Sequence, residues 1–168
     1  MTKQEFLRAV SRNGDDIIKT VVEMLRKTRA GYCVIGGLAV NAYVEPVVSL
    51  DLDIVIITDE IDKFLSLAGK KFKIERFPHS INLTAKKSDL RIQIQTDPRY
   101  QQFIERSERR KVLDKPMRVA CLEDVIKGKL WAYSDEKRRM SKRQKDLADI
   151  YRLVESYPKL KKLLPKKL

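Results

Sequence analysis

The chain has 168 residues, of which 43% are hydrophobic and 35% are charged. This composition excludes a disordered protein and is typical of one globular domain with a substantial core. A net charge of +13 predicts a polyanionic partner, with nucleic acid as the first candidate. No apolar run approaches the ~18 residues of a membrane span, and the polar start MTKQEF has no signal-peptide core. We therefore expect a cytoplasmic protein that does not bind membranes.

Helical periodicity dominates both ends of the chain, and strand-like runs lie between them. In chain order we predict helices over 4–10 and 15–30, a strand over 32–35, a short helix over 38–43, a strand over 53–57, a helix over 59–69, strands over 71–77, 81–85 and 90–96, a basic β region over 110–113 and 117–121, and helices over 122–135 and 143–157. Asp15 is a plausible helix cap and Gly31 a stop signal. The pattern predicts an α+β fold in which helices flank a mixed β-sheet and the C-terminal helices pack on the core.

No Gly- or Ser-rich linker divides the chain, so we expect a single domain over 1–168. Within it, 1–31 forms N-terminal helices, 32–120 forms the sheet core and 121–168 forms C-terminal helices.

Two glycines and two aspartates flank the short helix expected over 38–43. Asp51 and Asp53 are two residues apart, so in a strand they project from one face about 6.5–7 Å apart. A cation such as Mg2+, completed by water and phosphate oxygens, removes the repulsion between them. Gly36 and Gly37 come one strand earlier, where bare backbone N–H groups can meet an anion. Each motif alone is usually a turn or surface charge, but together they predict a metal and phosphate site.

Lys129 falls on the apolar side of the helix predicted over 122–135. The apolar stripe there consists of Leu122, Val125, Ile126, Leu130 and Tyr133. A buried ammonium needs an anion, which a triphosphate or a carboxylate would supply. The alternative is a lysine whose stem carries the charge outward to solvent.

The segment KDLAD on the last predicted helix also allows two interpretations. Lys145 and Asp149 have the spacing of an ordinary helical ion pair. Asp146 lies four residues before Ile150, at the border of the apolar stripe of this last helix. From there it can face a cleft and hold either Lys129 or the attacking group.

These motifs resemble the nucleotidyltransferase superfamily, and within it the AbiEii-type proteins, the toxin side of type IV toxin–antitoxin systems. The resemblance extends from about Tyr32 to Glu155. It matches Gly36 and Gly37 to a phosphate-binding turn, Asp51 and Asp53 to a metal-binding pair, Lys129 to a lysine-bearing helix, and Lys145, Asp146 and Asp149 to a K-D-x-x-D motif. It implies transfer of a nucleoside monophosphate from an NTP, with Mg2+ or Mn2+ as cofactor and a cognate antitoxin as a candidate partner. The implied catalytic residues are Asp51, Asp53, Lys129 and Asp146.

One position departs from the superfamily pattern. Many members carry a third carboxylate on a later strand, where this chain has Gln93, and an amide cannot serve as a base. Three interpretations follow: Asp146 takes over, metal activates the acceptor's own hydroxyl, or the chain binds nucleotide without turnover.

Basic residues gather in the segments 105–118, 137–145 and 158–168. The middle segment has no acid, and its cations are Lys137, Arg138, Arg139, Lys142, Arg143 and Lys145. We expect Lys137, Arg138, Arg139, Lys142 and Arg143 to bind RNA phosphates, although solvated helix ends also explain such runs. The resemblance makes a tRNA 3' end the leading acceptor. The alternatives are a degenerate fold that binds RNA or a protein, and a transferase acting on a protein or small-molecule hydroxyl.

Overall fold

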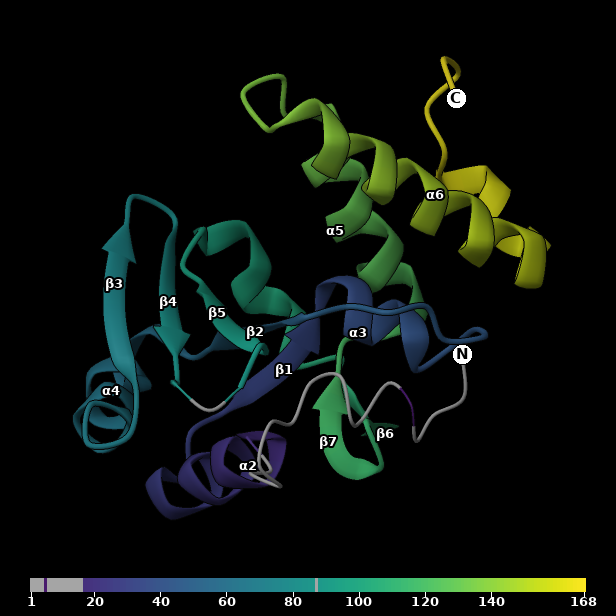
Figure 1. The fold of residues 1–168 in the computed structure, drawn as a ribbon. Coiled ribbons are helices and arrows are strands. Elements are labelled where there is room, and N and C mark those ends of the chain that lie inside the picture. Colours follow the sequence, from purple (N-terminus) through teal and green to yellow (C-terminus); the bar gives the residue numbers. More distant parts are fainter. Residues whose placement is uncertain (1–4, 6–16, 87) are drawn as a thin grey trace.

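The computed structural model describes residue 5, residues 17–86 and residues 88–168 (Figure 1). Its helices are α2 (Ile17–Thr28), α3 (Gly36–Asn41), α4 (Ile61–Ala68), α5 (Leu122–Ser134) and α6 (Met140–Ser156), with the short 3-10 helices η2 (Thr58–Glu60), η3 (Pro98–Phe103) and η4 (Pro158–Leu163). Its strands are β1 (Tyr32–Ile35), β2 (Asp51–Ile56), β3 (Lys73–Phe77), β4 (Ser80–Thr84), β5 (Arg91–Gln95), β6 (Glu108–Val112) and β7 (Lys115–Val119). The helix predicted over 4–10 and the Asp15 cap lie outside the described residues, apart from Glu5.

The seven strands form one mixed sheet in the order β3-β4-β5-β2-β1-β7-β6. β2 pairs parallel with β5, and β1 pairs parallel with β7, whereas the other neighbouring pairs are antiparallel. The central position therefore goes to β2, the strand that begins with the Asp51 and Asp53 pair. The predicted α+β fold with a mixed sheet is confirmed.

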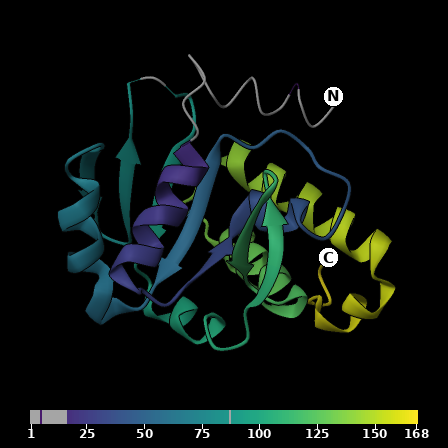
Figure 2. The same cartoon turned by 90° about the horizontal axis from the view of Figure 1, so that it is seen from below.

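Helices cover both faces of the sheet. Figures 1 and 2 show α2 and α4 on one side and α3, α5 and α6 on the other. Strand β2 reflects this division, because Leu52 and Ile54 are fully buried while Asp51 and Asp53 are only partly buried. Alternation along the strand thus directs both carboxylates toward α5 and α6. None of the helices in the described part of the chain is long and apolar enough to cross a membrane.

Three boundaries differ from the sequence prediction in ways that affect the site. Helix α3 begins at Gly36, two residues early, because Gly36 has a φ of 73° and turns the chain directly out of β1. Strand β2 begins at Asp51, so both aspartates lie inside the strand. Helix α6 begins at Met140, three residues early, and includes Lys142. The basic tail contains η4, whose Leu160 is fully buried.

Candidate active site

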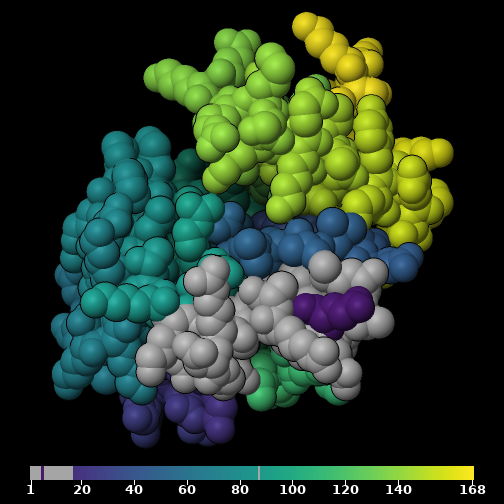
Figure 3. Space-filling view, in the orientation of Figure 1, coloured from purple at the N-terminus to yellow at the C-terminus, as the bar shows by residue number. Residues whose placement is uncertain are grey.

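A cleft separates the central strands from α5 and α6. Figure 3 shows the corresponding hollow between the teal β3–β5 segment and the green α5–α6 segment. Its lining includes Gly36, Asp51, Asp53, Gln93, Tyr100, Asp124, Lys129, Arg138, Lys142 and Asp146. The structure therefore brings together the glycine motif, the aspartate pair, the lysine helix and the K-D-x-x-D helix.

The two aspartates of β2 have different surroundings. Asp51 Oδ1 accepts a hydrogen bond from Arg91 Nε at 2.9 Å, and Arg91 is its register partner on β5. Burial raises the pKa of Asp53 to about 6, and the charge of Asp51 adds to this rise. The cations Lys129, Arg138 and Lys142 lower it, but by less. Asp51 is thus paired with a cation, whereas burial makes the carboxylate of Asp53 costly to ionise.

The two glycines pack closely against the aspartate strand. A β-carbon on Gly36 would collide with the carboxylate of Asp53, and one on Gly37 would lie 2.9 Å from Ser49 Oγ. Gly36 is partly exposed and lines the cleft, whereas Gly37 is buried. The first glycine therefore leaves room at the Asp53 carboxylate, and the second lets α3 approach the segment that leads into β2.

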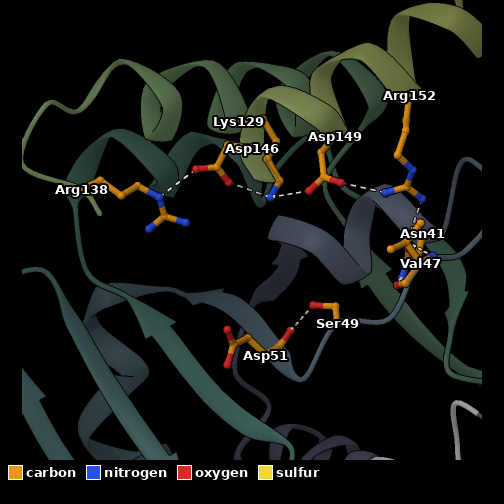
Figure 4. Close-up of polar contacts among 9 residues, drawn as sticks. All are labelled: Asn41, Val47, Ser49, Asp51, Lys129, Arg138, Asp146, Asp149 and Arg152. Atoms are coloured by element: carbon orange, nitrogen blue, oxygen red, sulfur yellow. Dashed lines mark hydrogen bonds and ion pairs between the residues drawn. The ribbon is translucent and has the colours of Figure 1, made fainter. Parts of the chain in front are cut away.

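Lys129 is held between two carboxylates. Its Nζ lies 3.0 Å from Asp146 Oδ1 and 2.8 Å from Asp149 Oδ2, as Figure 4 shows. Lys129 is 7% exposed, Asp146 1% and Asp149 3%. Burial lowers the pKa of Lys129, but the charges of Asp149 and Asp146 outweigh this effect, so its pKa lies above the ordinary value. Lys129 is charged and buried, and the alternative of a lysine reaching solvent is wrong.

The carboxylates of α6 also bind two arginines. Arg138 Nε donates to Asp146 Oδ2 at 2.8 Å, and Arg152 NH1 donates to Asp149 Oδ1 at 2.7 Å. Asp146 therefore holds Lys129, one of the two roles expected for it. The simple Lys145–Asp149 helical pair is not what the structure contains, because Asp149 pairs with Lys129 and Arg152 while Lys145 is exposed.

The basic run at the start of α6 divides into two groups. Arg138 and Lys142 line the cleft. Arg143 turns away: its Nε donates to the Tyr133 carbonyl at 2.7 Å, and its guanidinium lies over the Tyr133 ring. Lys137 and Arg139 are exposed. Of the six cations in the run, two therefore line the cleft and four do not, since Lys145 is exposed as well, and spacing alone does not reveal this division.

Gln93 lies where a third carboxylate was expected. It is the register partner of Asp53 on β5, and it lines the cleft. Its other register neighbour is Asn82 on β4. The cleft face of the sheet thus has an amide, not a base, beside Asp53.

Sequence reasoning gave no role to Asp124, Tyr100 or Arg152. Asp124 is 1% exposed, lines the cleft and accepts two hydrogen bonds from Arg106, at 2.8 and 3.0 Å. Tyr100 packs edge-on against Trp131 of α5, with ring centroids 5.1 Å apart. In the sequence Asp124 is one more acid in a first helical turn, and nothing marks Tyr100 as a cleft residue.

The donor set suits a hard divalent cation. Two adjacent carboxylates open to the cleft match the one or two carboxylates with which proteins hold Mg2+, whose other ligands are waters and phosphate oxygens. In the described part of the chain no group of three or more His, Cys, Asp or Glu side chains could enclose a metal by itself. The residues present therefore fit a metal that arrives with a phosphate ligand.

Comparison with known proteins identifies the family of the chain. Residues 32–167 match the sequence model of a family described as nucleotidyl transferase AbiEii toxin, type IV TA system. Comparison with curated proteins gives no match. Among solved structures, the antibiotic-resistance factor ANT(2'')-Ia is similar with a TM-score of 0.60 at 12% identity, over 93% of this chain and 85% of that one.

Two other solved structures share the fold. The lincosamide antibiotic adenylyltransferase LnuA, bound to lincomycin, has a TM-score of 0.58 at 12% identity, over 84% of this chain and 99% of its own. An antigenic nucleotidyltransferase-like protein from Paracoccidioides brasiliensis has a TM-score of 0.57 at 16% identity, over 83% of this chain and 74% of its own. The family match covers every motif in the cleft, and the chain therefore belongs to the AbiEii family of nucleotidyl transferases.

Proposed function

We propose that the chain transfers a nucleoside monophosphate from an NTP to a hydroxyl of RNA, with the tRNA 3' end as acceptor and Mg2+ or Mn2+ as cofactor. Because the family description names a type IV toxin, we also propose that the chain is the toxin of such a pair and that a cognate antitoxin is its partner.

The observation that carries this proposal is the opposite charge of the two cleft walls. The sheet wall presents Asp51 and Asp53. The helical wall presents Lys129, Arg138 and Lys142, and its two carboxylates, Asp124 and Asp146, are each paired with cations. A nucleoside triphosphate with its divalent cation carries both signs of charge. It can place the cation toward the sheet and phosphate oxygens toward the helices, so each wall meets its complement.

Asp51 and Asp53 would hold the cation, and Gly36 leaves space beside the Asp53 carboxylate. A bound cation would neutralise charge that develops on the transferred phosphoryl group and favour the ionised acceptor hydroxyl. On the opposite wall Arg138 and Lys142 would bind phosphate oxygens. Lys129 adds positive potential from behind them, because its ammonium already contacts Asp146 and Asp149.

The contacts of Asp146 bear on which group acts as base. Its Oδ1 binds Lys129 and its Oδ2 binds Arg138, so both oxygens already face cations. Both of its oxygens are thus engaged by cations and are not open to a proton of the acceptor. Gln93 cannot accept a proton either. These facts favour the interpretation in which metal activates the acceptor hydroxyl over the one in which Asp146 takes over.

The surface around the cleft favours a polyanionic acceptor. Lys137 and Arg139 are exposed on the turn between α5 and α6, next to the cleft residues Arg138 and Lys142. An RNA strand whose 3' end enters the cleft would place its preceding phosphates against this turn. A small acceptor would leave these cations without a role.

Incubation with each labelled NTP, Mg2+ and total tRNA tests the proposal. We expect label from one nucleotide in tRNA, and a loss of about 100-fold or more in Asp51→Asn and Asp53→Asn. The matched control is Asp62→Asn, which removes an exposed carboxylate from α4 on the other face of the sheet and should transfer normally.

Each other outcome identifies an alternative. Label in the protein would indicate a protein hydroxyl as acceptor, and label in an added aminoglycoside or lincosamide would indicate a small molecule. Binding of nucleotide and RNA without transfer would support the degenerate binding module, which the amide at Gln93 favours.

A further inference from the structure

Arg152 joins three separate parts of the chain. Its guanidinium NH1 donates to Asp149 Oδ1 at 2.7 Å, within α6. Its NH2 donates to Asn41 Oδ1 at 3.2 Å, at the end of α3, and also to the backbone carbonyl of Glu45. The side chain is 22% exposed, so these contacts are shielded from water in part. Figure 4 shows the resulting line of polar contacts from Lys129 through Asp149 and Arg152 to Asn41.

The segment 42–50 connects the glycine helix to the aspartate strand. The side chains of Val47 and Leu50 are 51% and 40% exposed, so apolar burial does little to hold them. Instead the Asn41 carboxamide binds both backbone groups of Val47: its Nδ2 donates to the carbonyl at 2.6 Å, and its Oδ1 accepts from the N–H at 3.1 Å. Arg152 donates to the same Oδ1 and also to the backbone carbonyl of Glu45. Two polar side chains therefore hold the exposed stretch 45–47, while Val44 and Val48 on either side of it pack against the core.

The end of this segment contacts both the glycine motif and the aspartate motif. Ser49 is 5% exposed, lies against Gly37, and donates from Oγ to the Asp51 carbonyl at 3.5 Å. A shift of the segment would move Ser49 and the start of β2 with it. At its other end, Arg152 fixes the carboxylate of Asp149 that holds Lys129. One guanidinium thus couples the helical wall of the cleft to the backbone that leads into the sheet wall.

We propose that Arg152 is a positioning residue, which braces the segment 42–50 against Asp149 and so sets Asp51 opposite Lys129. The inference rests on the proposed function, because it concerns the geometry in which that cleft binds a metal–nucleotide complex. Arg152 is not among the residues that line the cleft, and it acts through its neighbours. Its planar fork presents donors to Asp149, Asn41 and Glu45 from separate nitrogens, whereas the donors of a lysine ammonium all lie on one nitrogen.

Amide hydrogen exchange at Val47 tests the brace without any ligand. We expect exchange there to become about 10-fold faster or more in Arg152→Met and Arg152→Lys, while α2 and the central strands stay protected. Asn41→Ala should open the same segment. The Arg152→Met/Asn41→Ala double variant should then be little worse than the more severe single one, because both act on one element. The control Arg26→Met removes an exposed arginine from α2 and should change nothing.

The affinity for Mg2+–nucleotide and the rate of transfer test whether Arg152 positions the cleft residues. We expect Arg152→Lys and Asn41→Ala to need more Mg2+ for half-saturation and to lose about 10- to 100-fold in kcat/KM, since small displacements of catalytic groups have effects of this size. Unchanged Val47 exchange in both Arg152 variants would overturn the proposal, as would faster exchange in them with unchanged affinity and transfer. If the wild-type chain transfers no nucleotide, the proposed function fails. Val47 exchange and Mg2+–nucleotide affinity then still decide the role of Arg152.

Discussion

Replacing Lys129 with Met should destabilise the protein, because it removes the cation between two buried carboxylates. Lys129 is 7% exposed, and its Nζ lies 3.0 Å from Asp146 and 2.8 Å from Asp149. Breaking a buried ion pair by removing one partner typically costs 3–5 kcal/mol. Here each carboxylate keeps one arginine, Arg138 or Arg152, so we expect the lower end, about 3 kcal/mol.

Urea unfolding measures this change directly. With a slope of about 2 kcal/mol per molar urea, a loss of about 3 kcal/mol lowers the midpoint by about 1.5 M. The matched control is Lys127→Met on the same helix. Lys127 Nζ lies 3.9 Å from Asp124, its side chain is 42% exposed, and its loss should change stability by no more than about 0.5 kcal/mol.

A charge-balanced variant separates the lost ion pair from lost packing. Lys129→Met combined with Asp146→Asn removes one cation and one anion, leaves Asp149 paired with Arg152, and lets the partly exposed Arg138 reach water, so part of the stability should return. If Lys129→Met alone is as stable as the wild type, the ammonium is not a buried partner of these carboxylates and the reasoning fails.

Three further predictions follow from the site geometry. Asp53 is protonated at low pH in both states. Its folded pKa of about 6 exceeds its ordinary value of 3.8, so the unfolded state releases the proton first, and the metal-free protein should lose stability as pH rises from 3.8 to about 6. Asp53→Asn should abolish that loss and be about 1–3 kcal/mol more stable at pH 8 by urea unfolding, whereas parallel pH profiles would contradict the assignment. Lys137→Ser/Arg139→Ser should reduce the salt slope of RNA binding by about 2, whereas the control Lys161→Ser/Lys162→Ser on η4 should leave the slope unchanged. Gly36→Ala forces a β-carbon into the Asp53 carboxylate at a φ of 73°, so it should lower the melting temperature and weaken metal–nucleotide binding, and an unchanged melt would refute this.

Local patterns in the sequence were sufficient to predict most of the fold. The run from Asp51 to Ile56 alternates polar and apolar residues before becoming apolar, which indicates a strand with one polar face. The apolar stripe around Lys129 likewise predicts a buried ammonium that needs an anion. The boundary of α3 was missed because a helix that starts at a positive-φ glycine has no capping side chain to mark it.

The partners of the site residues could not be predicted, because they come from distant positions. Asn41 meets Arg152 across 111 residues, and Tyr43 meets Ala120 across 77. Arg138 is one cation among six in its run, and only the fold shows that it faces Asp146 while Arg143 turns back to Tyr133. The types of charged residue and their helical spacing predict the correct helices. The partner that each of these side chains binds depends on how α6 packs against α3 and α5.

The two walls of the cleft are electrostatically coupled, and this affects how a Lys129 variant should be interpreted. Lys129 lowers the pKa of Asp53 across the cleft. Lys129→Met should therefore raise the Asp53 pKa above 6 and weaken metal binding near neutral pH, even if the lysine never contacts nucleotide.

Metal–nucleotide affinity at two pH values separates the two roles of Lys129. If Lys129 acts only through Asp53, the loss of metal–nucleotide affinity in Lys129→Met should shrink between pH 6.5 and pH 8.5, because at pH 8.5 Asp53 is ionised in both proteins. If Lys129 contacts a phosphate oxygen, the defect should persist at the higher pH, because the lost contact does not depend on Asp53. The carboxylates that already surround its ammonium favour the first outcome. A defect of equal size at both pH values would instead show that nucleotide binding draws Lys129 away from Asp146 or Asp149.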